Sequence, residues 1–506
     1  MDLLFAGLEQ VFTVETLSLI AIGLIVGIII GAIPGLNVPL AVAIALPITF
    51  KLSPIGGLAM LVGIYKGGTY GGSLSAVLIN VPGTPAAAAT ALDGAALTRQ
   101  GKAGKALRMS LYASIIAEVI SDLALILFAV PVAAFALKIG PPETFSVGVF
   151  ALTLVGVLSQ GNMLKGVMAG ALGLLLSTFG VDPLTGDFRL TLGFDALSGG
   201  WSFIALVIGV FAVAEALVKV ERPLEKPMAM GTVRLSDPDH RLSRDDWRRS
   251  LPVITRSAPI GVLIGAIPGL GAAVSAYLNY GITRNLSKTP ERFGQGAIEG
   301  VAAAESGNNA VTSATFVPLL TLGVPGDVIT AIMLGAFIVH GLIPGPALFE
   351  QNSAFIAAFF VMVVVTTGLH LIIGRLGMPL FVQTTRISNK FLFPAIMVLS
   401  VTGVYVTTNS FFDVFTMLGF GLLGYFMIKC SFPVAPLLIG FILGPLIEIG
   451  LRQSVIMSRG SFDIFLTRPL SAAFLALAAV SVVIVGVREW RLARRNTPNP
   501  KTPEGD

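Results

Sequence analysis

The chain has 506 residues, of which 54% are hydrophobic and only 12% charged, and its formal net charge is +5. Soluble proteins carry about a quarter charged residues, so this composition excludes an ordinary soluble protein and predicts an all-α polytopic membrane protein. The single cysteine excludes a disulfide within the chain, and no Cys/His cluster indicates a metal or haem site. Basic cytoplasmic loops explain the positive charge better than nucleic-acid binding does.

The first half of the chain, residues 1–218, contains two stretches that should interrupt a membrane helix. "GAIPGL" (31–36) sets a proline between glycines, and "VPGTP" (81–85) holds two prolines and a glycine. In the second stretch Thr84 is expected to cap the next helix, with Pro85 at its first position. Irregular backbone at bilayer depth is tolerated only where it is buried in protein or lines a cavity.

A basic loop and four apolar segments complete the first half. The loop 98–108 carries Lys and Arg residues and no acid. Apolar segments are expected to cross the membrane at 109–137, 144–159, 164–180 and 198–218. A charged, proline-bearing linker follows at 219–256, and its basic character predicts a cytoplasmic location.

The second half, residues 257–487, repeats the landmarks of the first in the same order. "GAIPGL" returns at 265–270, and "GVPGDV" (323–328) corresponds to "NVPGTP", with Asp327 as the expected helix cap. This order indicates an internal duplication, although glycines shared for helix packing alone remain an alternative. A polar basic tail, 488–506, ends the chain.

Equivalent loops of the two halves carry opposite charge bias. The basic loop 98–108 corresponds to 340–352, which has no Lys or Arg, while the basic loop 283–296 corresponds to a barely basic stretch around Lys51. By the positive-inside rule this pattern predicts two inverted-topology repeats with broken helices or re-entrant hairpins. The side of the tail stays open, because it depends on whether 433–451 is a full crossing.

Broken helices in equivalent positions of two inverted halves typically form the binding site of a secondary transporter. Helix N-termini favour an anionic group, and unwound carbonyls can hold Na⁺. Residues beside the two breaks are expected to bind substrate: Lys66, Thr69, Tyr70, Ser73, Pro82, Gly83, Thr84, Asn308, Asn309, Pro325, Gly326 and Asp327. A second set is expected to bind the coupling cation: Asn37, Asn80, Ser306, Thr312 and Ser313. Structural hydrogen bonding is an equal alternative for each residue taken singly, and proline turns at the membrane surface are the alternative for the breaks.

Neither an enzyme nor a resident cofactor is expected. Asp327 follows "VPG" and not the Gly-x-Gly of an intramembrane aspartyl protease, and "AESG" (304–307) lacks the first glycine of a rhomboid-type serine motif. The coupling ion is expected to be Na⁺ or H⁺, with Na⁺ favoured by the Asn/Thr/Ser-rich flanks and a scarcity of buried acids. Helix ends and pairing between helices explain most acids in or beside apolar segments, namely Asp93, Glu118, Asp122, Glu215 and Asp413.

Long glycine- and proline-rich blocks carry a family resemblance. "GAIPGL…YKGGTYGGSLSAVLINVPGTPAAAATALDG", "EGVAAAESGNNA…PLLTLGVPGD…HGLIPGP" and "LIGFILGPLIEIGLRQS" resemble the large membrane subunit of the tripartite tricarboxylate transporter family. The resemblance implies cation-coupled symport of carboxylates, such as citrate or related organic acids, across the bacterial cytoplasmic (inner) membrane. It implies two partners, a periplasmic solute-binding protein and a small membrane subunit.

The same resemblance implies an elevator-type fold whose hairpin tips surround the substrate. The tips would be 81–85 and 324–327, with 66–73 and 305–313 beside them. The alternative function is a passive anion channel or a membrane scaffold of a transport complex, since proline-broken segments also build pores.

Overall fold

The computed structural model describes residues 2–34, 36–158, 163–221, 240–384 and 392–495. Within them, seven helices are long and apolar enough to cross a membrane, by length and composition, which confirms a multi-pass α-helical protein. These are Val14–Ala32, Ala103–Ala136, Phe203–Glu221, Ser353–Thr384, Phe411–Lys429, Ala435–Met457 and Pro469–Val487. Shorter apolar helices cover Val38–Thr49, Met163–Ser177, Val328–Val339 and Phe393–Thr408.

The chain forms two compact units, and each is built from both halves of the sequence. Unit 1 contains Met1–Lys138 and Trp201–Phe426, and unit 2 contains Ile139–Gly200 and Met427–Asp506. The units therefore differ from the sequence halves 1–218 and 257–487. A duplicated sequence need not fold into two separate units, so this division does not test the repeat boundaries, which stay a prediction.

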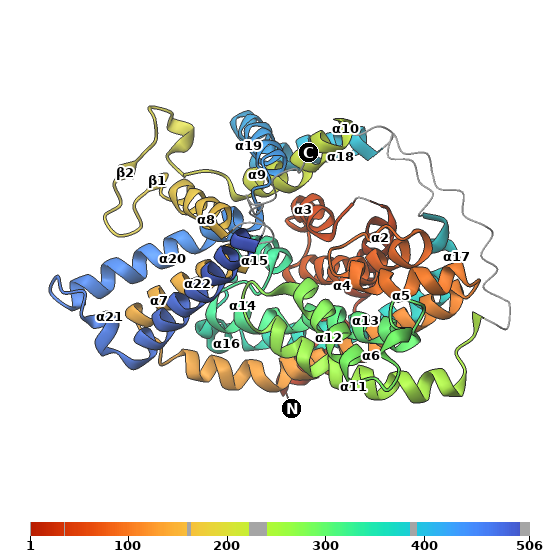
Figure 1. The fold of residues 1–506 in the computed structure, drawn as a ribbon. Helices are drawn as coiled ribbons and strands as arrows, with labels where there is room; N and C mark the ends of the chain where they lie inside the picture. Colours follow the sequence, from red (N-terminus) through yellow and green to blue (C-terminus); the bar gives the residue numbers. More distant parts are fainter. Residues whose placement is uncertain (1, 35, 159–162, 222–239, 385–391, 496–506) are drawn as a thin grey trace, which may run out of the picture. The chain divides into compact units, whose positions relative to one another are not determined.

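In unit 1, helices α2 and α4 pack through glycines spaced four residues apart (Figure 1). A Cβ added to Gly27 would lie 2.4 Å from the Ile64 carbonyl oxygen, and one added to Gly67 would lie 2.5 Å from that of Leu24. The two backbones are in contact, because only glycine leaves room for this approach. This part of unit 1 contains α2 (Val14–Ala32), α3 (Val38–Thr49), α4 (Pro54–Ile79), α5 (Ala87–Arg99), α6 (Ala103–Ala136), α11 (Arg244–Gly265), α12 (Gly271–Leu286), α13 (Ile298–Ala314), α14 (Phe316–Leu322), α15 (Val328–Val339), α16 (Pro346–Gln351) and α17 (Ser353–Thr384).

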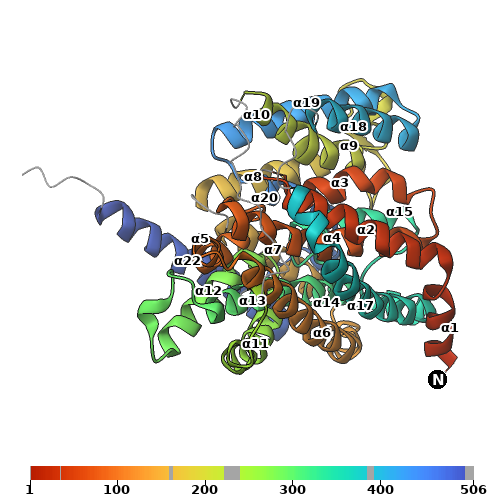
Figure 2. The same ribbon diagram turned by 90° about the vertical axis from the view of Figure 1, so that its right-hand side faces the viewer.

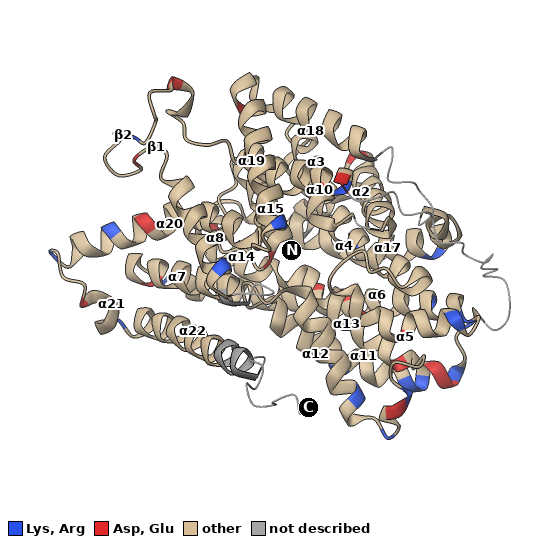
Figure 3. Ribbon diagram, turned by 45° about the horizontal axis from the view of Figure 1, so that its top comes forward, with Lys and Arg blue, Asp and Glu red and all other residues tan. Residues whose placement is uncertain are grey.

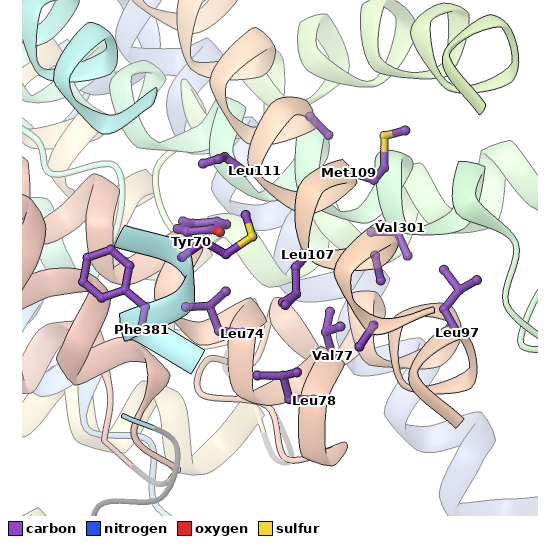
Figure 4. Packing of buried hydrophobic residues seen from close by; sticks show 14 of the residues in the cluster. Tyr70, Leu74, Val77, Leu78, Leu97, Leu107, Met109, Leu111, Val301 and Phe381 are labelled. Atoms are coloured by element: carbon purple, nitrogen blue, oxygen red, sulfur yellow. The ribbon is translucent and has the colours of Figure 1, made fainter. Parts of the chain in front are cut away.

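One apolar cluster joins seven helices of unit 1, namely α2, α4, α5, α6, α11, α13 and α17. Figure 4 shows Tyr70 and Leu74 of α4 beside Leu107 of α6, with Val301 of α13 and Phe381 of α17 around them. Leu97 of α5 belongs to the same cluster. These helices carry the predicted substrate residues, so the cluster fixes their mutual positions.

A second group of helices in unit 1 packs on α3, as Figure 2 shows. It comprises α9 (Phe203–Val207), the π-helical turn η2 (Ile208–Val213), α10 (Ala214–Glu221), α18 (Leu392–Thr408) and α19 (Phe411–Lys429). Gly209 of the π turn lies against α19, where an added Cβ would be 2.4 Å from the Met417 carbonyl oxygen. The predicted crossing 198–218 therefore corresponds to three consecutive helical pieces.

Unit 2 contains the remaining membrane helices and a short hairpin. Its elements are α7 (Pro141–Leu158), α8 (Met163–Ser177), β1 (Gly180–Val181), β2 (Phe188–Arg189), α20 (Ala435–Met457), α21 (Ile464–Thr467) and α22 (Pro469–Arg495). Helices α7 and α8 match the expected segments 144–159 and 164–180. Helix α20 contains most of 433–451 and is long enough for a full crossing.

The expected linker 219–256 is helical at its end. Ser243 accepts from the backbone N–H of Asp246, and the Asp246 carboxylate accepts from the N–H of Ser243, which forms a capping box at the start of α11. Because this cap starts the helix at Arg244, the linker contributes its last turns to unit 1. Residues 222–239 of the linker and 496–506 of the tail lie outside the described residues.

The two basic loops lie together in unit 1. Gln100 in the basic loop 98–108 donates to the Gln295 carbonyl in the basic loop 283–296 over 2.7 Å. On the other pair, a Cβ on Gly57 would lie 3.0 Å from Nε2 of His340, which follows α15. The first contact joins the two basic loops, and the second joins the first turn of α4, just after the stretch around Lys51, to the start of the loop 340–352.

Candidate functional site

The first break separates α4 from α5. Helix α4 ends at Ile79, Asn80 takes a left-handed conformation with φ of 57°, and α5 begins at Ala87. The Thr84 hydroxyl accepts from the Ala87 N–H over 3.2 Å, as a capping side chain does. Pro85, however, lies in a turn, so the prediction that it occupies the first helical position is wrong. The helix begins at Ala87, and Ala86, which has helical dihedrals, is its N-cap residue.

Gly83 packs the first break against α4 and the end of α2. Its N–H donates to the Gly72 carbonyl over 3.1 Å. An added Cβ would lie 2.2 Å from the carbonyl oxygen of Gly31, which begins the first "GAIPGL". Gly83 is therefore buried among other backbone groups, as irregular structure in a membrane requires.

The second break separates α14 from α15, and Asp327 caps α15 as expected. Its carboxylate accepts from the Thr330 N–H over 2.8 Å, and the Thr330 hydroxyl accepts from the Asp327 N–H over 3.0 Å. The Tyr65 hydroxyl donates to the other carboxylate oxygen over 2.6 Å. The Gly326 carbonyl accepts from the N–H of Gly269 in the second "GAIPGL" over 2.9 Å.

Helix α4 therefore contacts both breaks. Gly72 binds the first break and Tyr65 binds the second, and they lie two turns apart on one helix, about 10 Å along its axis. The two breaks are more than 200 residues apart in the sequence, yet both contact the same helix, two turns apart. The sequence predicted this pair of breaks, but it did not indicate that α4 holds them together.

A buried carboxylate lies between α4, α5, α6 and α13. Glu305 is fully buried and accepts from Ser73 over 2.6 Å, from Ser114 over 3.2 Å and from the hydroxyl of Thr90. Thr90 is in the first turn of α5, so this carboxylate lies at the N-terminal end of the helix that follows the first break. Asn309, a turn along α13, donates to Glu305 over 3.4 Å. Glu305 was expected only beside the site, and its position in an otherwise small, uncharged run was the available signal.

Lys66 is held as an ion pair in the same unit. Its ammonium donates to Asp122 over 2.7 Å, to Thr367 over 2.6 Å and to the Val363 carbonyl over 3.1 Å. The Ser313 hydroxyl binds the same Asp122 carboxylate. Because three oxygens use the three donors of the ammonium, Lys66 neutralises Asp122 in this arrangement.

Two further acids are paired between elements, as expected. Glu118 lies 3.1 Å from Nδ1 of His370 on α17. Asp93 accepts from the N–H groups of Gly294, Gly296 and Ala297, each over 2.8 Å, and so binds α5 to the loop 283–296. Buried acids are therefore not scarce in unit 1, and that argument for Na⁺ is wrong. The sequence showed these acids but not their partners, which lie far away in the chain.

Asn308 is a buried residue of the predicted substrate set whose side chain has no hydrogen-bond partner among the described residues. It is 1% exposed, and neither amide atom has a hydrogen-bond partner among the described residues. Such a group costs about 1–3 kcal/mol when left unsatisfied in the interior. Tyr70 is also buried, its hydroxyl has no partner in the described part of the chain, and its ring packs on His370. Both residues remain able to bind a ligand.

The other predicted residues have separate structural contacts. Thr69, Ser306 and Thr312 donate to carbonyls of their own helices. Asn37 caps α3 through the Leu40 N–H, and Asn80 is exposed at the end of α4. Pro82 is exposed and Pro325 is buried. The structure thus gathers Ser73, Asn309, Gly83 and Thr84 near the first break and Gly326 and Asp327 at the second, whereas the predicted cation set is dispersed.

Comparisons with known proteins agree on one family. The model of the tripartite tricarboxylate transporter TctA family matches residues 17–439. A protein of Agrobacterium vitis, described as a 52.8 kDa protein in the TAR-I ttuC' 3' region, is 39% identical over 443 residues, which is 88% of each chain. A second protein of that organism, from the TAR-II ttuC' 3' region, is 40% identical over 224 residues, 44% of this chain and 93% of its own. No solved structure matches this chain.

Proposed function

Because the chain belongs to the tripartite tricarboxylate transporter TctA family, we propose that it is the subunit through which a carboxylate crosses the bacterial cytoplasmic membrane, driven by a cation gradient. The contact of both helix breaks with α4 is the observation that supports this proposal most directly. It brings the N-terminal ends of α5 and α15 to one helix, and polar side chains lie near each end. This arrangement suits a ligand with several carboxylates, because each N-terminus offers backbone N–H groups and a positive dipole end.

The substrate is a tricarboxylate such as citrate or a related organic acid. Asn308 contributes an amide whose donor and acceptor both lack a partner within the residues that the structure describes. Thr84 and Gly83 belong to the first break and Gly326 to the second, so substrate bound there would contact both halves of the sequence. A ligand with two or more carboxylates could bind both helix ends at once.

The protein's own carboxylates explain why a cation must accompany the substrate. Glu305 lies beside the first turn of α5, and Asp327 caps α15. Like charges in a protein interior repel one another more strongly than they do in water, because the effective dielectric constant is lower. An anion entering between these acids would be opposed until a cation neutralises one of them, so the two ligands bind together.

Glu305 is the proposed site of that cation. Hydroxyl oxygens of Ser73, Thr90 and Ser114 surround the carboxylate, and Oδ1 of Asn309 has no partner among the described residues. Several hard oxygen ligands favour Na⁺, whereas a proton would require the carboxylate alone. We therefore favour Na⁺ over H⁺ as the coupling ion.

Two partner proteins and an inverted-repeat, elevator-type architecture belong to the same proposal. A periplasmic solute-binding protein would deliver the substrate, and a small membrane subunit would complete the transporter. The contact between the two basic loops supports inverted repeats, because inversion puts the basic loops of both halves on one side.

The test is uptake of labelled citrate into proteoliposomes, with and without an inward Na⁺ gradient, as the two partner proteins are added in turn. Accumulation above equilibrium that needs the gradient and both partners is the expected result. Equilibration that needs no gradient would instead identify a passive channel. Silence across a panel of tricarboxylates and dicarboxylates, with both partners present, would favour the scaffold.

A pair of variants on α13 tests the coupling site. Glu305→Gln should keep substrate exchange but lose Na⁺-driven accumulation by about tenfold or more, because the neutral side chain no longer needs a cation. Glu299→Gln is the matched control, since Glu299 lies in the first turn of the same helix and pairs with Arg292. Unchanged Na⁺ dependence in Glu305→Gln would remove Glu305 from the mechanism, and accumulation driven by a pH gradient alone would identify H⁺.

A further inference from the structure

A cavity of about 510 Å³ lies in unit 1 where α6, α17 and the start of α11 meet. Arg108 and Tyr112 reach it from α6, Trp247 from α11, and Arg375 from α17, while Arg241 lies just before α11. It is separate from the two helix breaks. Three arginines therefore line one cavity in a protein with few charges.

Among the described residues, the two acids at the start of α11 pair with cations that do not line the cavity. Asp245 pairs with Arg249 over 2.7 Å, and Asp246 pairs with Lys105 over 2.8 Å. Among the described residues that line the cavity, none is acidic. Figure 3 shows charged residues gathered around α5 and α11, in contrast to the largely uncharged helices. The described lining of the cavity therefore carries positive charge and no negative charge.

Aromatic and apolar residues surround these arginines in the manner of a membrane interface. The rings of Tyr112 and Trp247 lie with their centroids 5.5 Å apart. Tyr and Trp concentrate where the bilayer meets water. On α17, three apolar residues spaced four apart form an exposed stripe: Ile372, Leu376 and Leu380, which are 53%, 76% and 61% exposed. This stripe adjoins Arg375 on a helix long enough to cross the membrane.

We propose that this cavity binds the phosphate of an anionic phospholipid whose acyl chains lie along the apolar stripe of α17. Guanidinium groups bind phosphate oxygens in pairs, and basic pockets between membrane helices are suited to anionic headgroups. The Arg108 guanidinium donates to the His240 carbonyl over 2.8 Å, which ties the cavity wall to the segment before α11. A bound lipid would therefore hold α6, α11 and α17 together at this end of unit 1. The inference does not depend on the transported substrate.

The cavity contains its own fluorescent probe. The chain has three tryptophans, so Trp201→Phe with Trp490→Phe leaves Trp247 as the single one. This protein would be placed in nanodiscs with brominated phosphatidylglycerol or with brominated phosphatidylcholine of the same chains. Quenching of Trp247 should be stronger with phosphatidylglycerol at equal content, and equal quenching by both lipids would overturn the proposal.

Substitutions and a soluble competitor separate the lipid from a free anion. Arg241→Gln with Arg375→Gln should weaken the preference for phosphatidylglycerol by about tenfold, whereas Arg248→Gln, an exposed charge on α11, should keep it. Inorganic phosphate should not displace the lipid. Displacement by phosphate, or an unchanged preference in the folded double variant, would overturn the proposal. The comparison of two lipids on the unsubstituted cavity decides the question even if the double variant does not fold.

Discussion

The ammonium of Lys66 lies among three oxygens, from Asp122, Thr367 and Val363, at 2.6–3.1 Å. A lysine within an apolar, glycine-rich helix predicts a bound ligand or an ion-pair partner equally well. In the structure it has an ion-pair partner, Asp122, on another helix. The ammonium already supplies the positive charge beside Asp122, so a further cation is not needed there. This observation moves the proposed cation site from Ser313 to the neighbourhood of Glu305.

Removal of Lys66 should destabilise the protein through Asp122. Lys66→Met leaves a buried carboxylate without its cation and should cost about 3–5 kcal/mol of folding free energy. Lys66→Met with Asp122→Asn should recover much of this loss, because the acid is then neutral. The measurement is the thermal unfolding midpoint in detergent, with exposed Lys138→Met as the control. A double variant no more stable than the single one would contradict the pairing.

At the scale of single residues, the local hydrogen bonds were predictable and the distant ones were not. Asp327 and Thr330 are three residues apart, so the cap at α15 follows from sequence spacing. Glu305 and Thr90 are 215 residues apart, and no local pattern relates them. The sequence therefore located both breaks without revealing which acid lies beside the first.

Among the helices, glycines at four-residue spacing determine how α2 packs on α4. Gly27→Ala adds a Cβ 2.4 Å from a backbone oxygen of α4, so the helices must separate, at a cost of about 1–3 kcal/mol. Gly419→Ala in α19 is the matched control, because no heavy atom lies within 4 Å of its added Cβ. Unfolding midpoints of the two variants in detergent compare them directly. Equal midpoints would show that α2 and α4 do not need this contact.

The hairpin of unit 2 should respond to acid. The N–H of Leu184, followed by the guanidinium of Arg452, holds the pKa of Asp182 below its usual range. A lowered pKa in the folded state means that the stabilisation is complete above the ordinary Asp value, near 3.9, and is lost as the pH falls through the folded value. Hydrogen exchange in 180–189, corrected for intrinsic rates, should stay slow from pH 7 to pH 5 and accelerate only below about pH 4. Asp182→Asn should exchange faster than the parent at pH 7, and an unchanged rate would contradict this role.

Element positions could be predicted where composition changes sharply. The expected segments 109–137 and 144–159 match α6 and α7 closely, because polar loops bound them. The start of α5 was predicted too early, since proline and threonine also form a turn before a helix. The helical end of the linker was missed, although its Ser243 and Asp246 have the spacing of a capping box.

For the whole molecule, the division into two units could not be derived from the order of segments. Unit 1 and unit 2 each take chain from both halves, and contacts between distant segments decide this. The charge pattern of the loops predicts the side of the membrane on which each loop lies, and not which loops touch. Gln100 reaches Gln295 between the two basic loops, so the bias used for the inverted repeat has a counterpart in space.

The inverted topology can be tested with the single cysteine of the chain. A Cys430→Ser background has no cysteine, so one new thiol can be placed in each loop at an exposed position: Lys51→Cys, Lys102→Cys, Lys288→Cys or Glu350→Cys. A membrane-impermeant thiol reagent should label the second and third variants only in inverted vesicles, and the first and fourth only in right-side-out vesicles, because basic loops stay in the cytoplasm. Parallel repeats would instead put the equivalent positions 102 and 350 on the same side. Labelling of both from one side would therefore exclude inversion, and with it the assignment of the two helix breaks to equivalent places in opposite orientations.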